Sequence, residues 1–316
     1  MGLVIASQME ADFNASLRAH PTGPTVVGVP EARPWEAAND ADVMLVRPSP
    51  PWRGAREGPR PAAWPGRVKW VYSASVGVDF YPRWLLEAPL VTCGRGVASE
   101  EIADYVIAAV YLQAKDLERV RARSLAAWRQ APLGRVAGSV VGIVGLGAIG
   151  AAVARRALAI GALVTAVRRR RHIPSPVEGV ELLDDLAAVV ASADHLVLAL
   201  PATDASRSLI DASLLSHAKP TAHLINVARG SVLDQDALLA ALNAGRFGFA
   251  TLDVTEPEPL PADHPLWTHP LVRLTPHISS NYTLLRGVLF DKIVANLERF
   301  VRGEVLADIV DPIAGY

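Results

Sequence analysis

The segment 140–171 constrains the fold more than any other part of the chain. It opens with an apolar, β-branched run, Val140–Val144, continues through Gly145-Leu-Gly147-Ala-Ile-Gly150, and enters a helical stretch rich in alanine. A second apolar run, Leu163–Val167, follows. This order of strand, glycine turn, helix and strand is the setting in which a G-x-G-x-x-G sequence binds a dinucleotide.

Each glycine of the turn has a predicted role. Gly145 permits the tight turn, Gly147 lets the backbone approach a pyrophosphate, and Gly150 lets the helix pack closely on the strand. The pyrophosphate is expected on the N–H groups of Ala148 and Ile149, because the start of a helix favours an anion. A turn that only packs a helix onto a sheet is the alternative.

The second strand of this segment ends in four arginines. A NAD-specific site usually has an acidic residue about 20 residues after the glycines, where it binds the ribose 2′-hydroxyl. Arg168 occupies that place, Arg169–Arg171 follow, and the next carboxylate is Glu178. One guanidinium group can donate two parallel hydrogen bonds to phosphate oxygens. Arg168 and Arg169 would therefore attract the 2′-phosphate of NADP, which predicts NADP in preference to NAD. A solvated basic loop is the alternative.

The composition indicates a globular protein with room for two domains in 316 residues. A net charge of −1 argues against nucleic acid or a membrane surface as partner. The single cysteine, Cys93, is expected in the core, and its isolation fits the reducing cytoplasm. Neither a signal peptide nor a membrane-spanning run is expected, and no metal site is predicted.

Residues 1–98 alternate short strand candidates with helical or loop stretches, which predicts a parallel sheet. Pro48–Pro65 contains six prolines and is expected to be a loop that follows a strand end. Because ligands gather beyond the carboxyl ends of parallel strands, Arg47, Ser49 and Trp52 are candidate pocket residues, with a surface loop as the alternative. The strands are expected at Leu3–Ala6, Thr25–Val29, Val43–Val46, Val68–Tyr72 and Leu90–Thr92.

Residues 99–283 are predicted to form the dinucleotide-binding domain. A long helix is expected from Ser99, as a capped start, to about Trp128. A last helix, Leu284–Arg302, is expected to cross back, so that 284–316 completes the first domain. Further helices are expected near Leu182–Ala191, Ser206–Ser216 and Gln235–Asn243, and strands at His195–Leu200, Ala222–Val227, Gly248–Val254 and Val272–Leu274.

Three polar residues follow predicted strands of the second unit: Arg229, Glu258 and His277. Hydride transfer from a nicotinamide to a carbonyl needs a proton donor for the oxygen and a cation for a substrate carboxylate. A histidine oriented by a carboxylate can give the proton, and an arginine can hold the acid through two hydrogen bonds. Taken singly, each residue has an alternative: Arg229 as a surface ion-pair partner, Glu258 as a solvated loop acid and His277 as a hydrogen-bonded loop residue.

Five segments in order closely resemble the D-isomer-specific 2-hydroxyacid dehydrogenases, and the resemblance covers nearly the whole chain. It implies that Arg229, Glu258 (rather than Glu256) and His277 are catalytic, and that Asp253 lies near the nicotinamide carboxamide. It also implies cofactor contacts at Leu200, Pro201, Val227, Ala228 and His277, and a substrate carboxylate held by Arg229 and the backbone of Ser75, Val76 and Gly77. Arg47 is a further candidate for substrate binding because it follows a strand end. The segments are VVGIVGLGAIG (140–150), Leu200-Pro201, LINVARGSVLD (224–234), LDVTEPEPLP (252–261) and LTPHIS (274–279).

The resemblance implies an α/β fold of two Rossmann-like doubly wound domains, a flavodoxin-like substrate domain and a dinucleotide-binding domain, with a cleft between them. It also implies a cytoplasmic homodimer, with the helix after Ser99 contributing to the contact. The basic run at Arg168 resembles the glyoxylate and hydroxypyruvate reductase branch, which commonly prefers NADPH, with NAD as the other cofactor. The alternatives are a formate or phosphite dehydrogenase and a dinucleotide-sensing regulator that resembles the C-terminal-binding-protein corepressors.

Overall fold

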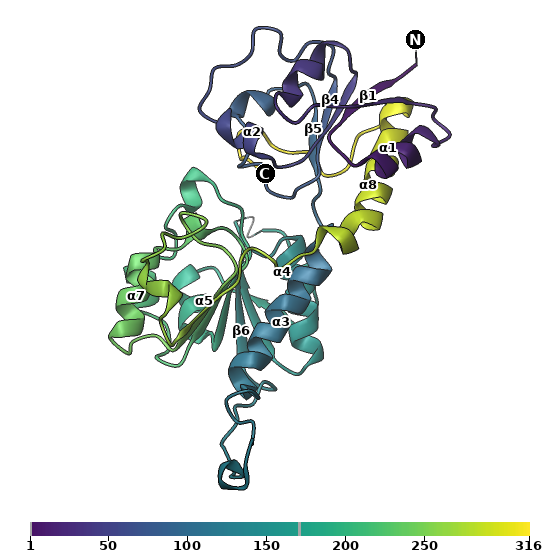
Figure 1. Ribbon diagram of the computed structural model, residues 1–316. Coiled ribbons are helices and arrows are strands. Elements are labelled where there is room, and N and C mark those ends of the chain that lie inside the picture. Colours follow the sequence, from purple (N-terminus) through teal and green to yellow (C-terminus); the bar gives the residue numbers. More distant parts are fainter. Residues whose placement is uncertain (1, 170–171) are drawn as a thin grey trace. The chain divides into compact units, whose positions relative to one another are not determined.

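The computed structural model describes residues 2–169 and 172–316, and the chain divides into two compact units (Figure 1). Unit 1 consists of Met1–Ala98 and Tyr282–Tyr316, and unit 2 of Ser99–Asn281. The second boundary lies two residues before the predicted one, because the last helix begins at Tyr282 rather than at Leu284. Each unit is built around one parallel sheet.

The sheet of unit 1 has the strand order β2-β1-β3-β4-β5, which is the flavodoxin-like order. Its strands are apolar on both faces because both faces are covered. In β3, Val43 and Leu45 pack beside α1 and α8, whereas Met44 and Val46 pack in the other core with Trp52. The elements are β1 Val4–Ser7, α1 Ala11–Arg18, β2 Thr25–Gly28, η1 Pro34–Asn39, β3 Val43–Val46, α2 Pro50–Gly54, β4 Trp70–Ser73, η2 Arg83–Leu85, β5 Val91–Cys93 and α8 Tyr282–Arg302.

The sheet of unit 2 has the order β12-β11-β10-β9-β6-β7-β8, in which the chain reverses direction across the sheet between β6 and β9. This is the dinucleotide-binding order with one strand added, and it confirms the predicted fold class. The elements are α3 Ser99–Lys115, η3 Leu125–Ala127, β6 Val140–Val144, α4 Ala148–Ala159, β7 Leu163–Val167, β8 Val180–Leu182, α5 Leu186–Ser192, β9 His195–Leu198, η4 Asp204–Ser206, α6 Ala212–Leu215, β10 His223–Asn226, η5 Gly230–Val232, α7 Gln235–Asn243, β11 Phe249–Leu252, η6 Pro265–Trp267 and β12 Val272–Leu274.

The predicted long helix is too long by about thirteen residues, since α3 ends at Lys115 and Asp116 takes a positive φ of 35°. The segment 116–139 then extends away from the rest of unit 2 and carries only the short turn η3 (Figure 1). In the part of the predicted helix beyond Lys115, large apolar side chains are exposed: Leu125 is 92% exposed and Trp128 is 80% exposed. The helical spacing of apolar residues thus continues in the sequence beyond Lys115, but no surface of unit 2 is there for them to pack on, and the helix ends.

Two smaller predictions were also wrong, and one strand was missed. Ser99 does not cap α3, because it is itself helical and its buried hydroxyl has no hydrogen-bond partner. The predicted loop Pro48–Pro65 contains the short helix α2, whose prolines lie in its first turn, where no backbone N–H is needed. The short strand β8 was not predicted.

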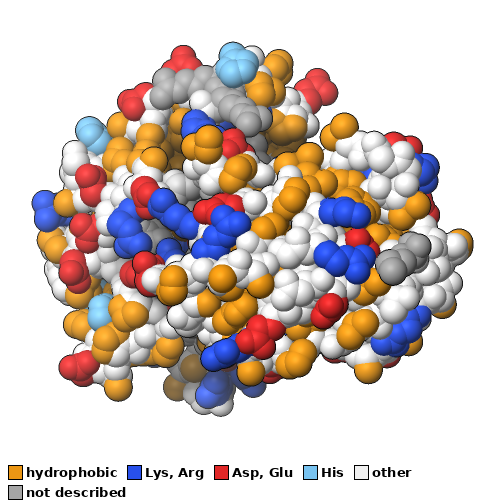
Figure 2. All heavy atoms as spheres, turned by 90° about the horizontal axis from the view of Figure 1, so that it is seen from above, with side chains coloured by type: hydrophobic (Ala, Val, Ile, Leu, Met, Phe, Trp, Pro, Cys, Tyr) orange, Lys and Arg blue, Asp and Glu red, His pale blue; other side chains and the backbone are white. Residues whose placement is uncertain are grey.

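Cys93 is buried in the core of unit 1, as predicted. Among the helices in the described part of the chain, none is long and apolar enough to cross a membrane. Figure 2 shows acidic and basic side chains interspersed over the face it presents, in keeping with a net charge of −1.

Candidate active site

The residues predicted to bind the cofactor and to act in catalysis follow strands of the unit 2 sheet. All seven strands are parallel, so their carboxyl ends meet at one edge. The glycine turn follows β6, Arg168 and Arg169 follow β7, and Leu200 and Pro201 come shortly after β9. Val227, Ala228 and Arg229 follow β10, Asp253 and Glu258 follow β11, and His277 follows β12.

The three glycines of the turn differ in what surrounds them. Gly145 has a φ of 100°, and a Cβ there would lie 2.6 Å from the carbonyl oxygen of Ala199. A Cβ on Gly150 would lie 2.2 Å from the carbonyl oxygen of Gly145, whereas nothing lies within 4 Å of a Cβ on Gly147. Packing therefore explains Gly145 and Gly150 but not Gly147, and the open space above Gly147 fits a pyrophosphate at the start of α4.

The end of β7 lies beside the glycine turn. The N–H of Gly145 donates to the carbonyl of Val167 (3.0 Å), and Arg168 is the next residue. Arg168 is half-buried, and its Nη1 donates to the carbonyl of Pro174 (3.3 Å). Arg169 is exposed, and Arg170 and Arg171 lie outside the described residues. The residue that follows β7 beside the glycine turn is thus an arginine, where a NAD-specific site usually has an acidic residue.

The side chains of His277 and Glu258 form a direct pair, in which Nδ1 of His277 is 2.8 Å from Oε1 of Glu258. Both side chains are a little more than a third exposed. His277 has a positive φ of 55°, and its N–H donates to the carbonyl of Asp253 (2.9 Å). Because the carboxylate occupies Nδ1, the imidazole presents Nε2 away from Glu258 as a proton donor or acceptor.

Asp253 is almost fully buried and binds the loop that carries His277. Its carboxylate accepts hydrogen bonds from the Thr275 hydroxyl (2.7 Å) and from the N–H groups of Ile278 (2.8 Å) and Ser279 (2.9 Å). The Thr275 hydroxyl gives its one proton to Asp253, so the Tyr105 hydroxyl, 2.6 Å away, is the donor to Thr275. Tyr105 of α3 was missed, since nothing in its helical context signals this contact.

Arg229 lies on a turn closed by the side chain of Asn226. The amide of Asn226 donates to the carbonyl of Arg229 (3.0 Å) and accepts from the N–H of Ala228 (3.0 Å). Nη1 of Arg229 donates to the carbonyl of Ala228 (2.8 Å), and the side chain is half-buried. Asparagine closes turns in this way through its short amide, which is the signal that could have identified Asn226.

The loop that carries Glu258 is held from two sides. A Cβ on Gly230 would lie 2.0 Å from the carbonyl carbon of Thr255, so only glycine fits there. The side chain of Gln235 donates to the carbonyl of Glu256 (2.6 Å) and accepts from its N–H (3.0 Å). Glu256 is thus held by its backbone, and it is the side chain of Glu258 that reaches His277.

The segment Ser75–Gly77 of unit 1 is shaped by its serine. The Ser75 hydroxyl donates to the carbonyl of Gly77 (2.6 Å), and the N–H of Ser75 donates to the hydroxyl of Ser73 (3.3 Å). In the described part of the chain, the N–H groups of Val76 and Gly77 make no hydrogen bond. Such N–H groups suit a carboxylate ligand.

Three further residues of unit 1, Arg47, Ser49 and Trp52, were predicted to line a pocket, and they differ in burial and in their partners. Arg47 is paired with Glu10 (3.1 Å) and Glu31 (2.8 Å). Trp52 is a core residue rather than a pocket residue: it is fully buried, and its indole N–H donates to the side chain of Gln8 (2.8 Å). The hydroxyl of Ser49 is also buried.

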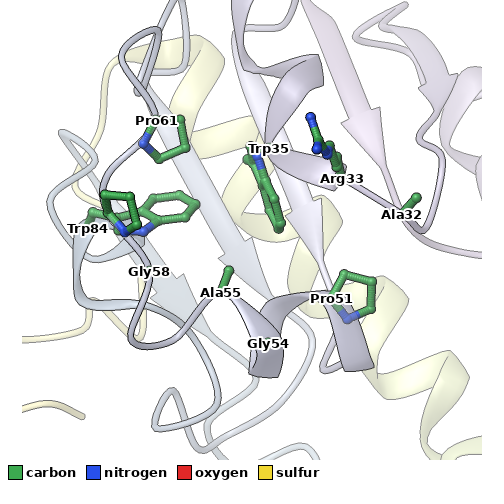
Figure 3. Close-up of a pocket in the computed structure, with 10 residues that line it drawn as sticks. Ala32, Arg33, Trp35, Pro51, Gly54, Ala55, Gly58, Pro61 and Trp84 are labelled. Atoms are coloured by element: carbon green, nitrogen blue, oxygen red, sulfur yellow. The ribbon is translucent and has the colours of Figure 1, made fainter.

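A pocket of about 390 Å³ does lie beside the proline-rich segment (Figure 3). Its lining includes Trp35 and Trp84, together with Pro51 and Pro61. None of the residues predicted to bind substrate lines this pocket, and the one arginine in it, Arg33, is paired with Glu36 (3.1 Å).

Comparison with known proteins identifies the family of the chain. Residues 107–279 match the family described as "D-isomer specific 2-hydroxyacid dehydrogenase, NAD binding domain". Glyoxylate/hydroxypyruvate reductase A of Serratia proteamaculans is 32% identical over 300 residues, which cover 90% of this chain and 92% of that protein.

Two solved structures are similar over nearly their full length. A D-isomer specific 2-hydroxyacid dehydrogenase from Xanthobacter autotrophicus, in complex with NADPH and MES, has a TM-score of 0.81 and 30% identity, covering 100% of this chain and 99% of that one. The NADPH-dependent glyoxylate/hydroxypyruvate reductase of Sinorhizobium meliloti, with NADP and sulfate, has a TM-score of 0.79 and 26% identity, covering 100% of both chains. The chain therefore belongs to the D-isomer-specific 2-hydroxyacid dehydrogenase family and is an NAD(P)-dependent oxidoreductase.

Proposed function

We propose that this enzyme reduces a small 2-oxo acid of the glyoxylate or hydroxypyruvate type to the D-2-hydroxy acid, with NADPH preferred over NADH. The observation that carries the proposal is the 2.8 Å pair of His277 and Glu258, at the sheet edge that also holds the glycine turn. The relatives named for glyoxylate and hydroxypyruvate support the substrate class.

The cofactor would be held by the turn Gly145–Gly150, with the pyrophosphate on the N–H groups of Ala148 and Ile149. Arg168 would bind a 2′-phosphate, and Arg169 would add positive charge beside it. Leu200, Pro201, Val227 and Ala228 would line the nicotinamide half. A bound, reduced nicotinamide supplies hydride to the carbonyl carbon of the substrate.

His277 would give a proton from Nε2 to the oxygen of the substrate as negative charge develops there. Glu258 accepts the hydrogen bond from Nδ1, so it orients the ring with Nε2 free for the substrate. Asp253 holds the loop that carries His277 through three hydrogen bonds, to Thr275, Ile278 and Ser279. These contacts support the proposal, because they would orient His277 before substrate binds.

The substrate carboxylate would be bound by Arg229, whose planar guanidinium can make two parallel hydrogen bonds. The unpaired N–H groups of Val76 and Gly77 in unit 1 are proposed as further donors, with Ser75 shaping their loop. Arg47 is proposed as a residue near the substrate rather than a direct ligand, because Glu10 and Glu31 already bind its guanidinium.

The function is tested by following oxidation of NADPH and of NADH against glyoxylate, hydroxypyruvate, pyruvate and phenylpyruvate. We expect the highest kcat/KM for glyoxylate or hydroxypyruvate with NADPH. Equal or better use of NADH would contradict the cofactor preference, and activity confined to phenylpyruvate would contradict the substrate class. Oxidation of formate or phosphite without 2-oxo acid reduction would contradict the proposed reaction.

We also propose a homodimer that uses α3 and the segment 116–139. Tyr111 and Leu112 of α3 are exposed, as are Leu125 and Trp128 on the segment, and large exposed apolar side chains mark contact surfaces. Light scattering of the purified protein tests this: a mass twice the 33.7 kDa of one chain is expected. The double variant Leu125→Ser, Trp128→Ser should shift the protein toward monomer.

A further inference from the structure

Gln235 is a buried polar residue to which the proposed reaction assigns no part. It is the first residue of α7, and its side chain binds a loop 21 residues further along the chain. Nε2 of Gln235 donates to the carbonyl of Glu256 (2.6 Å), and Oε1 accepts from the N–H of the same residue (3.0 Å). One side chain, 8% exposed, thus binds both backbone polar groups of the residue that lies two positions before Glu258.

The contact requires a carboxamide of this length. A carboxamide carries a donor and an acceptor side by side, and the peptide of Glu256 uses both. The reversed amide would set donor against donor and acceptor against acceptor, so the two partners fix the orientation of the group. An ionised glutamate at position 235 would have no proton to donate, and an asparagine would be one methylene shorter. Two hydrogen bonds from one planar group fix the direction of the bound peptide as well as its distance.

The backbone from which Gln235 extends is itself fixed. Asp234 precedes α7, and its carboxylate accepts from the N–H of Ala237 (2.9 Å). The N–H of Asp234 donates to the carbonyl of Ile210 (3.0 Å), and Ile210 is fully buried. Gln235 therefore reaches the loop from a helix start that is tied to the core of unit 2.

The loop 255–259 has few other supports. It is largely exposed, and its two prolines have no N–H to donate. Within the described residues, the hydrogen bonds from the loop backbone to the rest of unit 2 are those with Gln235. Together with the close packing of Thr255 on Gly230, the amide of Gln235 thus determines where the loop lies.

The pair of Glu258 and His277 depends on the position of this loop. Both side chains are more than a third exposed, so packing does little to hold them, and their 2.8 Å hydrogen bond relies on the two backbones that carry them. Asp253 holds the backbone on the histidine side. A displacement of the other loop by about 1 Å would take Oε1 of Glu258 beyond hydrogen-bond distance of Nδ1.

We propose that Gln235 is a positioning residue for the reaction, which acts through Glu258 on the orientation of His277. The inference rests on the proposed function, because it needs His277 as the proton donor. Loss of the amide should lower the rate of proton transfer. It should leave the binding of NADPH and of the 2-oxo acid largely unchanged, because the glycine turn and the turn of Arg229 have supports of their own.

Steady-state kinetics of Gln235→Met give the first test. This variant keeps the length of the side chain and removes both hydrogen bonds. We expect kcat to fall about tenfold, with both KM values within about twofold of wild type. Ala240→Gly, at an exposed site of α7, weakens the same helix and should keep the wild-type kcat. If Gln235→Met does not fold, Gln235→Glu replaces it, because it keeps the acceptor and, when ionised, lacks the donor.

A double-mutant cycle separates action through Glu258 from a general loss of structure. In a Glu258→Ala background, Gln235→Met should lower kcat by less than about twofold, because the carboxylate that it positions is already absent. Equal effects of Gln235→Met in the two backgrounds, or a wild-type kcat in the single variant, would overturn the proposal.

A third measurement does not depend on turnover. In ¹⁵N-histidine-labelled protein, the ring resonances of His277, assigned by their absence in His277→Ala, should move in Gln235→Met toward their positions in Glu258→Ala. Unmoved resonances would contradict the positioning role. If the wild type reduced no 2-oxo acid, the proposed function would fail, whereas these resonances would still decide whether Gln235 holds the pair of Glu258 and His277.

Discussion

Gly230 and Thr255 lie in backbone contact, so that a Cβ at position 230 would be 2.1 Å from the carbonyl oxygen of Thr255. The two residues belong to the loops that carry Arg229 and Glu258. Because the contact leaves no room for a methyl group, one loop cannot move without the other. Arg229, the proposed substrate ligand, and Glu258, the proposed partner of the proton donor, thus depend on a single contact for their relative placement.

Gly230→Ala should therefore impair both loops. We expect a loss of about 2 kcal/mol in the free energy of unfolding from overpacking, and a fall in kcat/KM of about 100-fold from misplaced groups. Urea unfolding and steady-state kinetics measure these effects. Gly287→Ala is the control, since a Cβ there meets nothing within 4 Å and the residue is in the exposed part of α8. It should stabilise that helix by up to ~1 kcal/mol.

His277→Ala should lower kcat by about 100- to 10,000-fold, the range expected for loss of a general acid. Binding of NADPH, measured by fluorescence titration, should stay within a few-fold of wild type, because the glycine turn is intact. Glu258→Gln should lower kcat less, since the amide oxygen can still accept from Nδ1 and orient the ring, although through a weaker, uncharged hydrogen bond. Wild-type turnover in His277→Ala would refute the proton-donor assignment.

Arg168→Ala should raise the KM for NADPH by about tenfold, the effect of one lost bidentate or charge-assisted contact. The KM for NADH should change little, because NADH has no 2′-phosphate. Because a misfolded variant would bind both cofactors less well, an unchanged KM for NADH in the same variant controls for misfolding. A parallel rise in both values would show that Arg168 shapes the site without reading the phosphate.

Acid should destabilise unit 2 through His195 and His223. Both have a folded pKa below the ordinary value of 6.5, so below pH 6.5 the unfolded chain binds more protons than the folded chain. The stability is complete above pH 6.5 and falls as the pH decreases, by at most about 1.4 kcal/mol per pH unit for each group. Urea unfolding between pH 7.5 and 5 measures the slope; His195→Gln should reduce it, and His217→Gln, at an exposed site, should not.

Tyr105→Phe should test the support of the His277 loop from α3. The variant removes the donor to Thr275 (2.6 Å) and leaves the Thr275 hydrogen bond to Asp253. We expect a several-fold lower kcat with little change in KM, and about 1 kcal/mol less stability from one lost hydrogen bond. A change in stability alone, with kcat intact, would show that Tyr105 does not position the loop.

The sequence predicted the parts of the fold that local patterns determine. The glycine turn, β3 and α7 could be located because apolar periodicity and turn residues act over short distances. The end of α3 could not, because it depends on where the sheet stops offering a surface. The same limit explains β8, which has only three residues and no core of its own.

Within the candidate site, the residue types were predictable and their supports were not. Arg229, Glu258 and His277 follow strands that the sequence shows, but their distances depend on the order of strands in the sheet. Gln235 holds Glu256 across 21 residues of sequence, and the pairing of His195 with His223 spans 28 residues. Such contacts arise from neighbouring strands and carry no signal in either residue's local sequence.

The position of α8 has a consequence for protein synthesis. Leu289, Ile293 and Leu297 of this helix are buried in the core of unit 1, where each contributes roughly 1.5–3 kcal/mol by burial. On the ribosome, all of unit 2 is made before these residues emerge. Until residues 282–316 are translated, that side of the sheet formed by the first 98 residues is therefore covered by α1 without α8, and unit 1 is completed after unit 2.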